Sequence, residues 1–146
     1  MRSSKLRTIA YWTTTAVIAL FFIGGGAADV AQPPDVVKLI THLGYPTYFA
    51  TLIGVWKVLG GIAVIAPRLP RLKEWAYAGI FFDLTGAAVS HVSVGDGAFD
   101  VAIPLALSVV LVASWALRPA SRRLGVVLPW ADAAGETATT PGPAVG

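Results

Sequence analysis

Two ionisable side chains, Lys57 and Asp83, lie near the centres of two separate apolar runs of the sequence. A single charge inside a membrane costs about 2.5 to 3.5 kcal/mol on insertion scales, so each of them needs a compensating group. Lys57 is thirteen residues before Pro70 and Asp83 is thirteen residues after it. Because a helical hairpin that turns at Pro70 would bring both charges to the same depth, we predict an intramembrane ion pair between Lys57 and Asp83.

Each of these charges shares a helix face with a stripe of small residues, of the kind that lets membrane helices approach closely. The stripe residues are Gly54 and Gly61 beside Lys57, and Gly79, Gly86 and Ser90 beside Asp83. Two interpretations stay open. The pair either locks the register of its two helices, or it belongs to a proton path or a cavity that binds a polar head group.

A second polar group is expected at one membrane interface, and it consists of Asp29, His42, His91, Asp96 and Asp100. Two histidines on different segments could ligate haem or a metal ion, but interfacial hydrogen bonding accounts for both without a ligand. No His or carboxylate spacing matches a zinc or hydrolytic motif. We therefore predict no metal site, identify no cofactor from the residues themselves, and leave the catalytic residues unassigned.

Four apolar runs must position these side chains, and each is long enough to cross a hydrocarbon core of about 30 Å. The expected spanning helices are residues 9–28, 48–66, 75–92 and 101–117, with a short helix at residues 34–43 in the first connection. The basic start and Gly26-Ala27-Ala28 also fit a signal peptide, but the first run exceeds an h-region of about 7 to 15 residues. A first spanning helix is the preferred interpretation. Pro104 is expected in the first turn of the last span, where proline is tolerated.

The basic residues indicate how these helices are oriented. Nine of the eleven Lys and Arg residues fall in three clusters. These clusters precede the first span (residues 2–7), connect the second and third spans (68–73) and follow the fourth span (118–123). The other two connections carry the acidic residues named above. This is the positive-inside pattern, and it predicts that both termini lie in the cytoplasm.

Composition places the chain in a lipid bilayer. Hydrophobic residues make up 55% and charged residues 13%, where soluble domains carry about 25% charged residues. We predict an all-α, four-helix transmembrane bundle that forms one domain over residues 1–130 in the inner membrane of a bacterium, followed by a disordered tail at residues 131–146. The basic residues are dispersed rather than gathered on one face, which argues against a nucleic acid partner. Since the chain has no Cys, it cannot form a disulfide, relay a dithiol or bind an iron–sulfur cluster through cysteine.

Four sequence motifs carry a family resemblance. They are HLGYP at residues 42–46, KVLGG at 57–61, PRLKEWAYAG at 70–79, and FDLTGA at 82–87 with Ser90-His91 and Gly95-Asp96. Over residues 8–123 the chain resembles the DoxX-like family of small four-helix bacterial membrane proteins, and Lys57, Asp83 and His91 match the family pattern. The family takes its name from a subunit of a thiosulfate:quinone oxidoreductase. The resemblance therefore implies an association with quinone or with membrane oxidoreductase subunits.

Three functions are compatible with these observations. The preferred one is an accessory or scaffold subunit, in a quinone-linked redox assembly or as a homo-oligomer, because the chain carries helix-packing stripes and no redox side chain. The second is a small proton-linked transporter or carrier that uses Lys57 and Asp83. The third is an enzyme that acts alone on quinone or lipid. It is the weakest, because no set of acid, base and nucleophile is evident.

Overall fold

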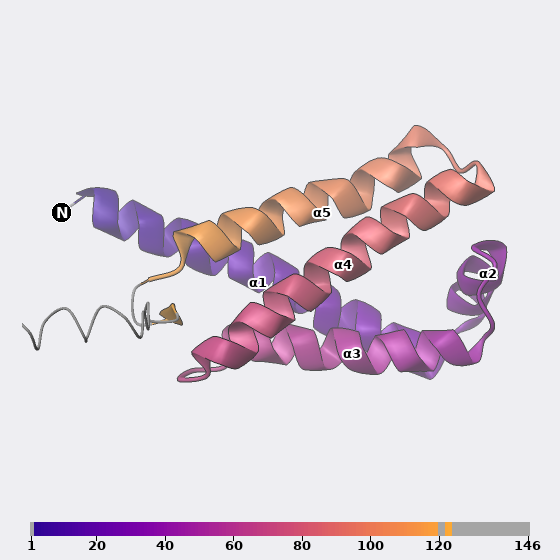
Figure 1. The fold of residues 1–146 in the computed structure, drawn as a ribbon, viewed down its shortest axis with the longest axis horizontal. Helices are drawn as coiled ribbons and strands as arrows, with labels where there is room; N and C mark the ends of the chain where they lie inside the picture. Colours follow the sequence, from indigo (N-terminus) through magenta and orange to yellow (C-terminus); the bar gives the residue numbers. More distant parts are fainter. Residues whose placement is uncertain (1, 120–121, 124–146) are drawn as a thin grey trace, which may run out of the picture.

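The computed structural model describes residues 2–119 and 122–123, and this part of the chain is helical without any strand. The helices are α1 (Arg2–Ala31), α2 (Pro34–His42), α3 (Tyr48–Ile65), α4 (Pro70–Val94) and α5 (Ala98–Leu117) (Figure 1). The expected short helix of the first connection is α2, and the four long helices cover the four expected spans. The tail predicted to be disordered lies outside the described residues.

Three of these helices are long and apolar enough to cross a membrane, namely α1 from Lys5 to Ala31, α3 and α5. Their length and apolar composition point to a membrane protein. α4 is not among them, although it is 25 residues long. The helix contains Asp83 at its centre and charged residues in its first turn, which reduce its apolar character.

Three helix starts lie earlier than the sequence predicted, and α1 begins at Arg2 although its span was expected from residue 9. α4 begins at Pro70, because proline at the first helical position has the required φ and lacks an N–H that would be unpaired there. α5 begins at Ala98, so Pro104 lies inside the helix and not in its first turn, which corrects the expectation. Pro104 is buried, and its carbonyl accepts a hydrogen bond of 2.9 Å from the Ser108 hydroxyl.

The most extensive helix contact joins α1 and α3. A Cβ atom added to Gly26 would lie 2.6 Å from the Gly54 carbonyl oxygen, and one added to Gly61 would lie 2.7 Å from the Ile23 side chain. The two backbones therefore touch at these positions, and only glycine fits. The small-residue stripe of α3 packs on α1, not on α4.

The hydrophobic core is formed by buried side chains from all four long helices. One buried cluster contains Ile18 and Phe22 of α1, Val64 of α3, Ile80 of α4 and Leu111 of α5. Beyond this core the helices separate. α3 and α4 meet near their connection and diverge towards α2 (Figure 1), and this divergence creates the cavity described next.

Candidate functional site

A cavity of about 650 Å³ lies between α3 and α4, with α2 and the following loop at one end. Aromatic side chains form much of its wall: Phe22, Phe49, Trp56, Trp75 and Phe82 all line it. Cavities of roughly 300 to 1,000 Å³ with apolar walls and a few polar groups are typical small-molecule sites. This cavity is the candidate functional site of the chain.

The small residues of α4 keep this space open. Gly79 and Gly86 both line the cavity, and a Cβ atom added at either position would meet no other atom within 4 Å. Larger residues here would project into the cavity. The α4 stripe, which was expected at a helix contact, therefore faces empty space, and Asp83 lies on the same face.

Lys57 makes an ion pair with Asp29 at the wall of the cavity. The Lys57 Nζ atom lies 2.8 Å from Asp29 Oδ2, and the two side chains are only 17% and 15% exposed. The close contact of α1 and α3 explains the pairing: Asp29 packs over Gly54, and Lys57 packs over Gly26. Each side chain thus fills the space beside the other helix's glycine, and their ends meet.

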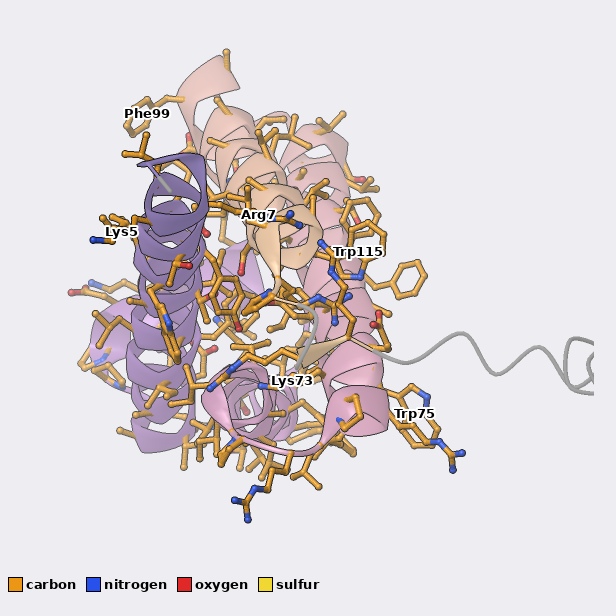
Figure 2. All side chains as sticks on the ribbon, turned by 90° about the vertical axis from the view of Figure 1, so that its left-hand side faces the viewer. Lys5, Arg7, Lys73, Trp75, Phe99 and Trp115 are labelled. Carbon is orange, nitrogen blue, oxygen red and sulfur yellow. The ribbon has the colours of Figure 1, made fainter. Side chains whose placement is uncertain are left out.

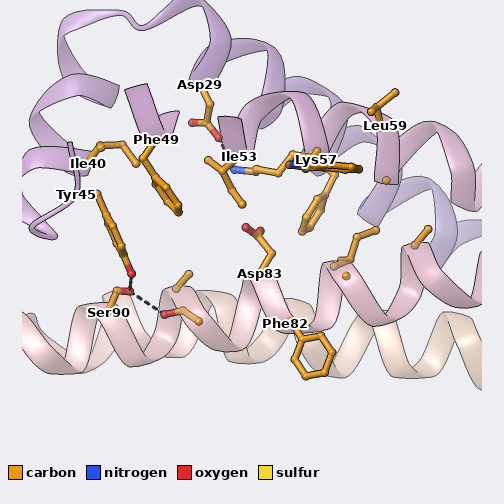
Figure 3. Close-up of a pocket in the computed structure, with 18 of the residues that line it drawn as sticks. Asp29, Ile40, Tyr45, Phe49, Ile53, Lys57, Leu59, Phe82, Asp83 and Ser90 are labelled. Carbon is orange, nitrogen blue, oxygen red and sulfur yellow. Dashed lines mark hydrogen bonds and ion pairs between the residues drawn. The ribbon is translucent and has the colours of Figure 1, made fainter. Parts of the chain in front are cut away.

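The predicted direct contact between Lys57 and Asp83 is not formed. The Asp83 carboxyl points into the cavity towards the Lys57–Asp29 pair from the opposite wall (Figure 3). Among the described residues, none makes an ion pair or a hydrogen bond with Asp83, whereas Lys57 is bonded to Asp29. The hairpin argument placed both residues at the same depth, and both line this cavity. They do not touch, because α1 occupies the face of α3 that was expected to meet α4.

Sequence reasoning missed Asp29 as the partner of Lys57, because the first span was expected to end at residue 28 and Asp29 was assigned to the connection. In the structure α1 continues to Ala31. The run Gly24-Gly25-Gly26, one turn before Asp29, was the available signal. It indicated close helix packing near this carboxylate but not which helix would pack there.

The α2 end of the cavity carries a hydrogen-bonded cluster of His42, His91 and Asp96. His42 Nε2 lies 2.6 Å from Asp96 Oδ1, and His91 Nδ1 lies 2.6 Å from Asp96 Oδ2. These hydrogen bonds, from His42 first and His91 second, lower the pKa of the Asp96 carboxyl below its usual value. The structure thus brings together three of the residues expected in the polar group at this interface, while Asp29 pairs with Lys57 and Asp100 lies in the first turn of α5.

Within the described part of the chain, no three or more His, Asp or Glu side chains are arranged to hold a metal ion. Each histidine of the cluster directs a ring nitrogen at Asp96 instead of at a shared point. The cluster ties α2 to the turn between α4 and α5. Nearby, the Tyr45 hydroxyl and the Ser90 hydroxyl lie 2.8 Å apart and add a second link between the loop after α2 and α4.

Comparisons with known proteins agree with the sequence motifs. The model of the DoxX-like family matches residues 13–114, which is most of the chain. An uncharacterized protein, YdgD of Bacillus subtilis (strain 168), is 26% identical over 97 residues, covering 66% of this chain and 84% of the relative. No solved structure matches.

Proposed function

The chain belongs to the DoxX-like family, and from this premise we propose that it is an accessory membrane protein that holds a lipid-soluble ligand between α3 and α4. The cavity is the observation that supports this proposal, since it combines apolar walls with the Asp29–Lys57 pair and the Asp83 carboxyl. Apolar walls receive the body of such a ligand, and a few polar groups orient its head.

In the proposed arrangement α1, α3, α4 and α5 all cross the inner membrane of a bacterium, and both termini lie in the cytoplasm. α4 belongs in the membrane because it packs along α5, so that Asp83 faces the cavity and not lipid. The basic clusters all fall at the end of the bundle where α1 begins and α5 ends, which supports the cytoplasmic assignment. We call this the basic end.

The absence of Cys makes this orientation easy to test, since any introduced thiol is the only one. A maleimide that cannot cross the membrane should label Lys38→Cys and Gly97→Cys from outside intact cells. It should label Arg71→Cys only after permeabilisation. Labelling of the last variant in intact cells would contradict the proposed topology.

The proposed ligand class is a quinone or quinol, which comes from the family resemblance and fits the chemistry of the cavity. A flat ring can pack against the aromatic walls, and the oxygens of a quinone can accept a hydrogen bond from the Lys57 ammonium group. Without Cys, thiol or iron–sulfur chemistry would come from a partner. The proposed role is therefore accessory, beside membrane oxidoreductase subunits or in a homo-oligomer.

Tryptophan fluorescence can test the ligand, because Trp56 and Trp75 line the cavity. A short-chain quinone should quench the tryptophan fluorescence of the purified protein, and this quenching should saturate as the quinone concentration rises. Gly79→Phe fills the cavity and should weaken this binding about tenfold or more. Gly24→Phe is the matched control, since Gly24 also has open space around it but does not line the cavity. Quenching that never saturates, or that is equal in both variants, would exclude quinone binding in this cavity.

Asp83 has no ion-pair or hydrogen-bond partner among the described residues, and this favours a second candidate function, a small proton-linked carrier. A carboxyl that faces an existing ion pair can take up a proton, or it can compete with Asp29 for Lys57, and either event changes the charge of the cavity. Proteoliposomes that contain a pH-sensitive dye would test this function. Proton flux that is lost in Asp83→Asn but kept in Asp35→Asn would support the carrier, and absence of flux in the parent protein would reject it.

A further inference from the structure

The basic end contains two cationic side chains that are almost completely buried, Lys73 at 1% exposed and Arg118 at 3%. Lys73 points into the space between the helices, whereas Lys5 points outward (Figure 2). The Lys73 Nζ atom donates hydrogen bonds of 3.1 and 2.6 Å to the carbonyl oxygens of Ala63 and Val64, in the last turns of α3. The negative end of that helix dipole stabilises Lys73.

Arg118 is only partly satisfied by its neighbours. Its Nη2 atom lies 2.7 Å from Glu74 Oε1, and its Nε atom donates a hydrogen bond of 3.0 Å to the Trp115 carbonyl oxygen. The remaining nitrogen of the guanidinium group, Nη1, is buried and has no hydrogen-bond partner among the described residues. An unpaired donor of a buried charged group is costly, so an additional acceptor is expected there.

Tyr11 presents a second unpaired polar atom at the same level of the bundle. Its hydroxyl is fully buried, and within the part of the chain that the structure describes it has no hydrogen-bond partner. Thr15 of α1 and Ser114 of α5 touch through their hydroxyls at 2.7 Å. Tyr11 precedes Thr15 by four residues and Arg118 follows Ser114 by four. Because α1 and α5 run in opposite directions (Figure 1), both residues lie one turn from this contact, towards the basic end.

Among the residues that the structure describes, the cations of this group outnumber the carboxylates that pair with them. Arg122 adds a third cation: its guanidinium lies 6.0 Å from the Tyr11 ring and donates a hydrogen bond of 3.2 Å to the Ile65 carbonyl oxygen. Among the described residues, Glu74 is the one carboxylate that pairs with these cations. The carbonyl oxygens at the end of α3 account for Lys73 and Arg122, but not for the free edge of Arg118 or the Tyr11 hydroxyl.

We propose that the basic end holds an oxyanion site, in which Tyr11, Arg118 and Arg122 bind a phosphoryl group. Guanidinium groups bind phosphate oxygens strongly because their N–H donors match the oxygen geometry. The source of the group is either the head group of an anionic lipid or free phosphate. In the proposed topology the site faces the cytoplasmic leaflet, where basic pockets between helices bind anionic head groups.

The full-length protein, purified in a mild detergent and stripped of lipid, provides the test. Its thermal unfolding is followed with phosphatidylglycerol, with phosphatidylcholine of the same acyl chains, with inorganic phosphate, and with chloride at matched ionic strength. We expect phosphatidylglycerol to raise the Tm above the value in phosphatidylcholine, because ligands that bind the folded state stabilise it. If phosphate raises the Tm as well, the site accepts a free oxyanion. If only phosphatidylglycerol does so, the site recognises a lipid head group.

Two variants separate this site from general attraction to a basic surface. Tyr11→Phe removes an unpaired hydroxyl, so the lipid-free protein should be at least as stable as the parent, yet its affinity for the anion should fall about three- to tenfold. Arg122→Gln should weaken binding about tenfold. The controls are Tyr48→Phe, which removes an exposed hydroxyl, and Arg71→Gln, which removes an exposed charge at the basic end. The proposal fails if neither anion raises the Tm of the parent protein, or if all four variants respond alike.

Discussion

The glycine stripes of α3 and α4 have the same spacing in the sequence but different surroundings in the structure. Gly54 of α3 touches the backbone of α1, so that an added Cβ would lie 2.7 Å from the Gly26 carbonyl oxygen. Gly79 and Gly86 of α4 have no neighbour within 4 Å of an added Cβ, and they line a cavity. Small residues thus permit close approach but do not ensure it. Whether a stripe becomes a helix contact or a cavity wall depends on which helix reaches it.

The charged residues differ in the same way. Lys57 lies on the α3 stripe, which α1 covers, and it pairs with Asp29 of α1. Asp83 lies on the α4 stripe, which lines the cavity, and it has no ion-pair partner among the described residues. Close packing of α1 on α3 therefore brings a partner to Lys57. The cavity leaves the Asp83 carboxyl accessible to a ligand or a proton.

The largest expected effect comes from removing one partner of the ion pair between Lys57 and Asp29. Lys57→Met or Asp29→Asn alone should reduce the free energy of unfolding by about 3 to 5 kcal/mol, because each leaves a buried charge uncompensated. The double variant should recover much of that loss. Asp83→Asn is the matched control and should change stability little. Unfolding of these variants in detergent gives the coupling energy of Lys57 and Asp29, and a second double variant, Lys57→Met with Asp83→Asn, gives that of Lys57 and Asp83. Coupling of Lys57 to Asp83 and not to Asp29 would reverse the comparison of the two stripes.

Alanine substitution compares the two stripes directly. Gly54→Ala should cost about 1 to 3 kcal/mol, because its Cβ would overlap backbone atoms of α1 that cannot move without separating the helices. Gly79→Ala should be neutral or slightly stabilising, since alanine favours a helix and the space is open. Thermal unfolding of both variants provides the measurement. Equal destabilisation would mean that the α4 stripe is covered in the membrane.

The smallest effect concerns the hydrogen bonds that hold α2 at the end of the cavity. Hydrogen bonding lowers the pKa of Asp96 in the folded protein, so its carboxylate contributes stability above the ordinary carboxyl pKa of about 4. That contribution is lost as the pH falls through the lower pKa of the folded state. The Tm difference between the parent and Asp96→Asn should therefore be present at pH 6 and should shrink below about pH 4.

Asp35→Asn is the control for this experiment, because Asp35 is an exposed carboxylate on α2 with only a 3.8 Å contact to Lys38. It should show little pH-dependent difference from the parent. A difference that grows on acidification in Asp96→Asn would contradict the assigned role of Asp96. It would then be the protonated carboxyl, not the carboxylate, that holds α2.

The helices themselves could be predicted from the sequence. Apolar runs of membrane-spanning length, and proline and glycine at their ends, place α2, α3 and α5 within about three residues of their observed bounds, whereas α1 and α4 begin about seven and five residues earlier than expected. The early starts of α4 and α5 were missed, because Pro70 and Pro104 were given the wrong positions relative to a helix start. The grouping of His42, His91 and Asp96 was also expected, since residues at the ends of neighbouring helices lie at similar depth.

The sequence by itself therefore determined the helical elements, the clustering of basic residues at one end of the bundle, and the residues whose burial demands a partner. Only the tertiary structure decided the partners. Local spacing specifies which face of a helix carries a stripe, but the helix that covers this face depends on the crossing of whole helices. The contact of Gly26 with Gly54 brings Asp29 to Lys57, and the divergence of α3 and α4 leaves Asp83 facing a cavity.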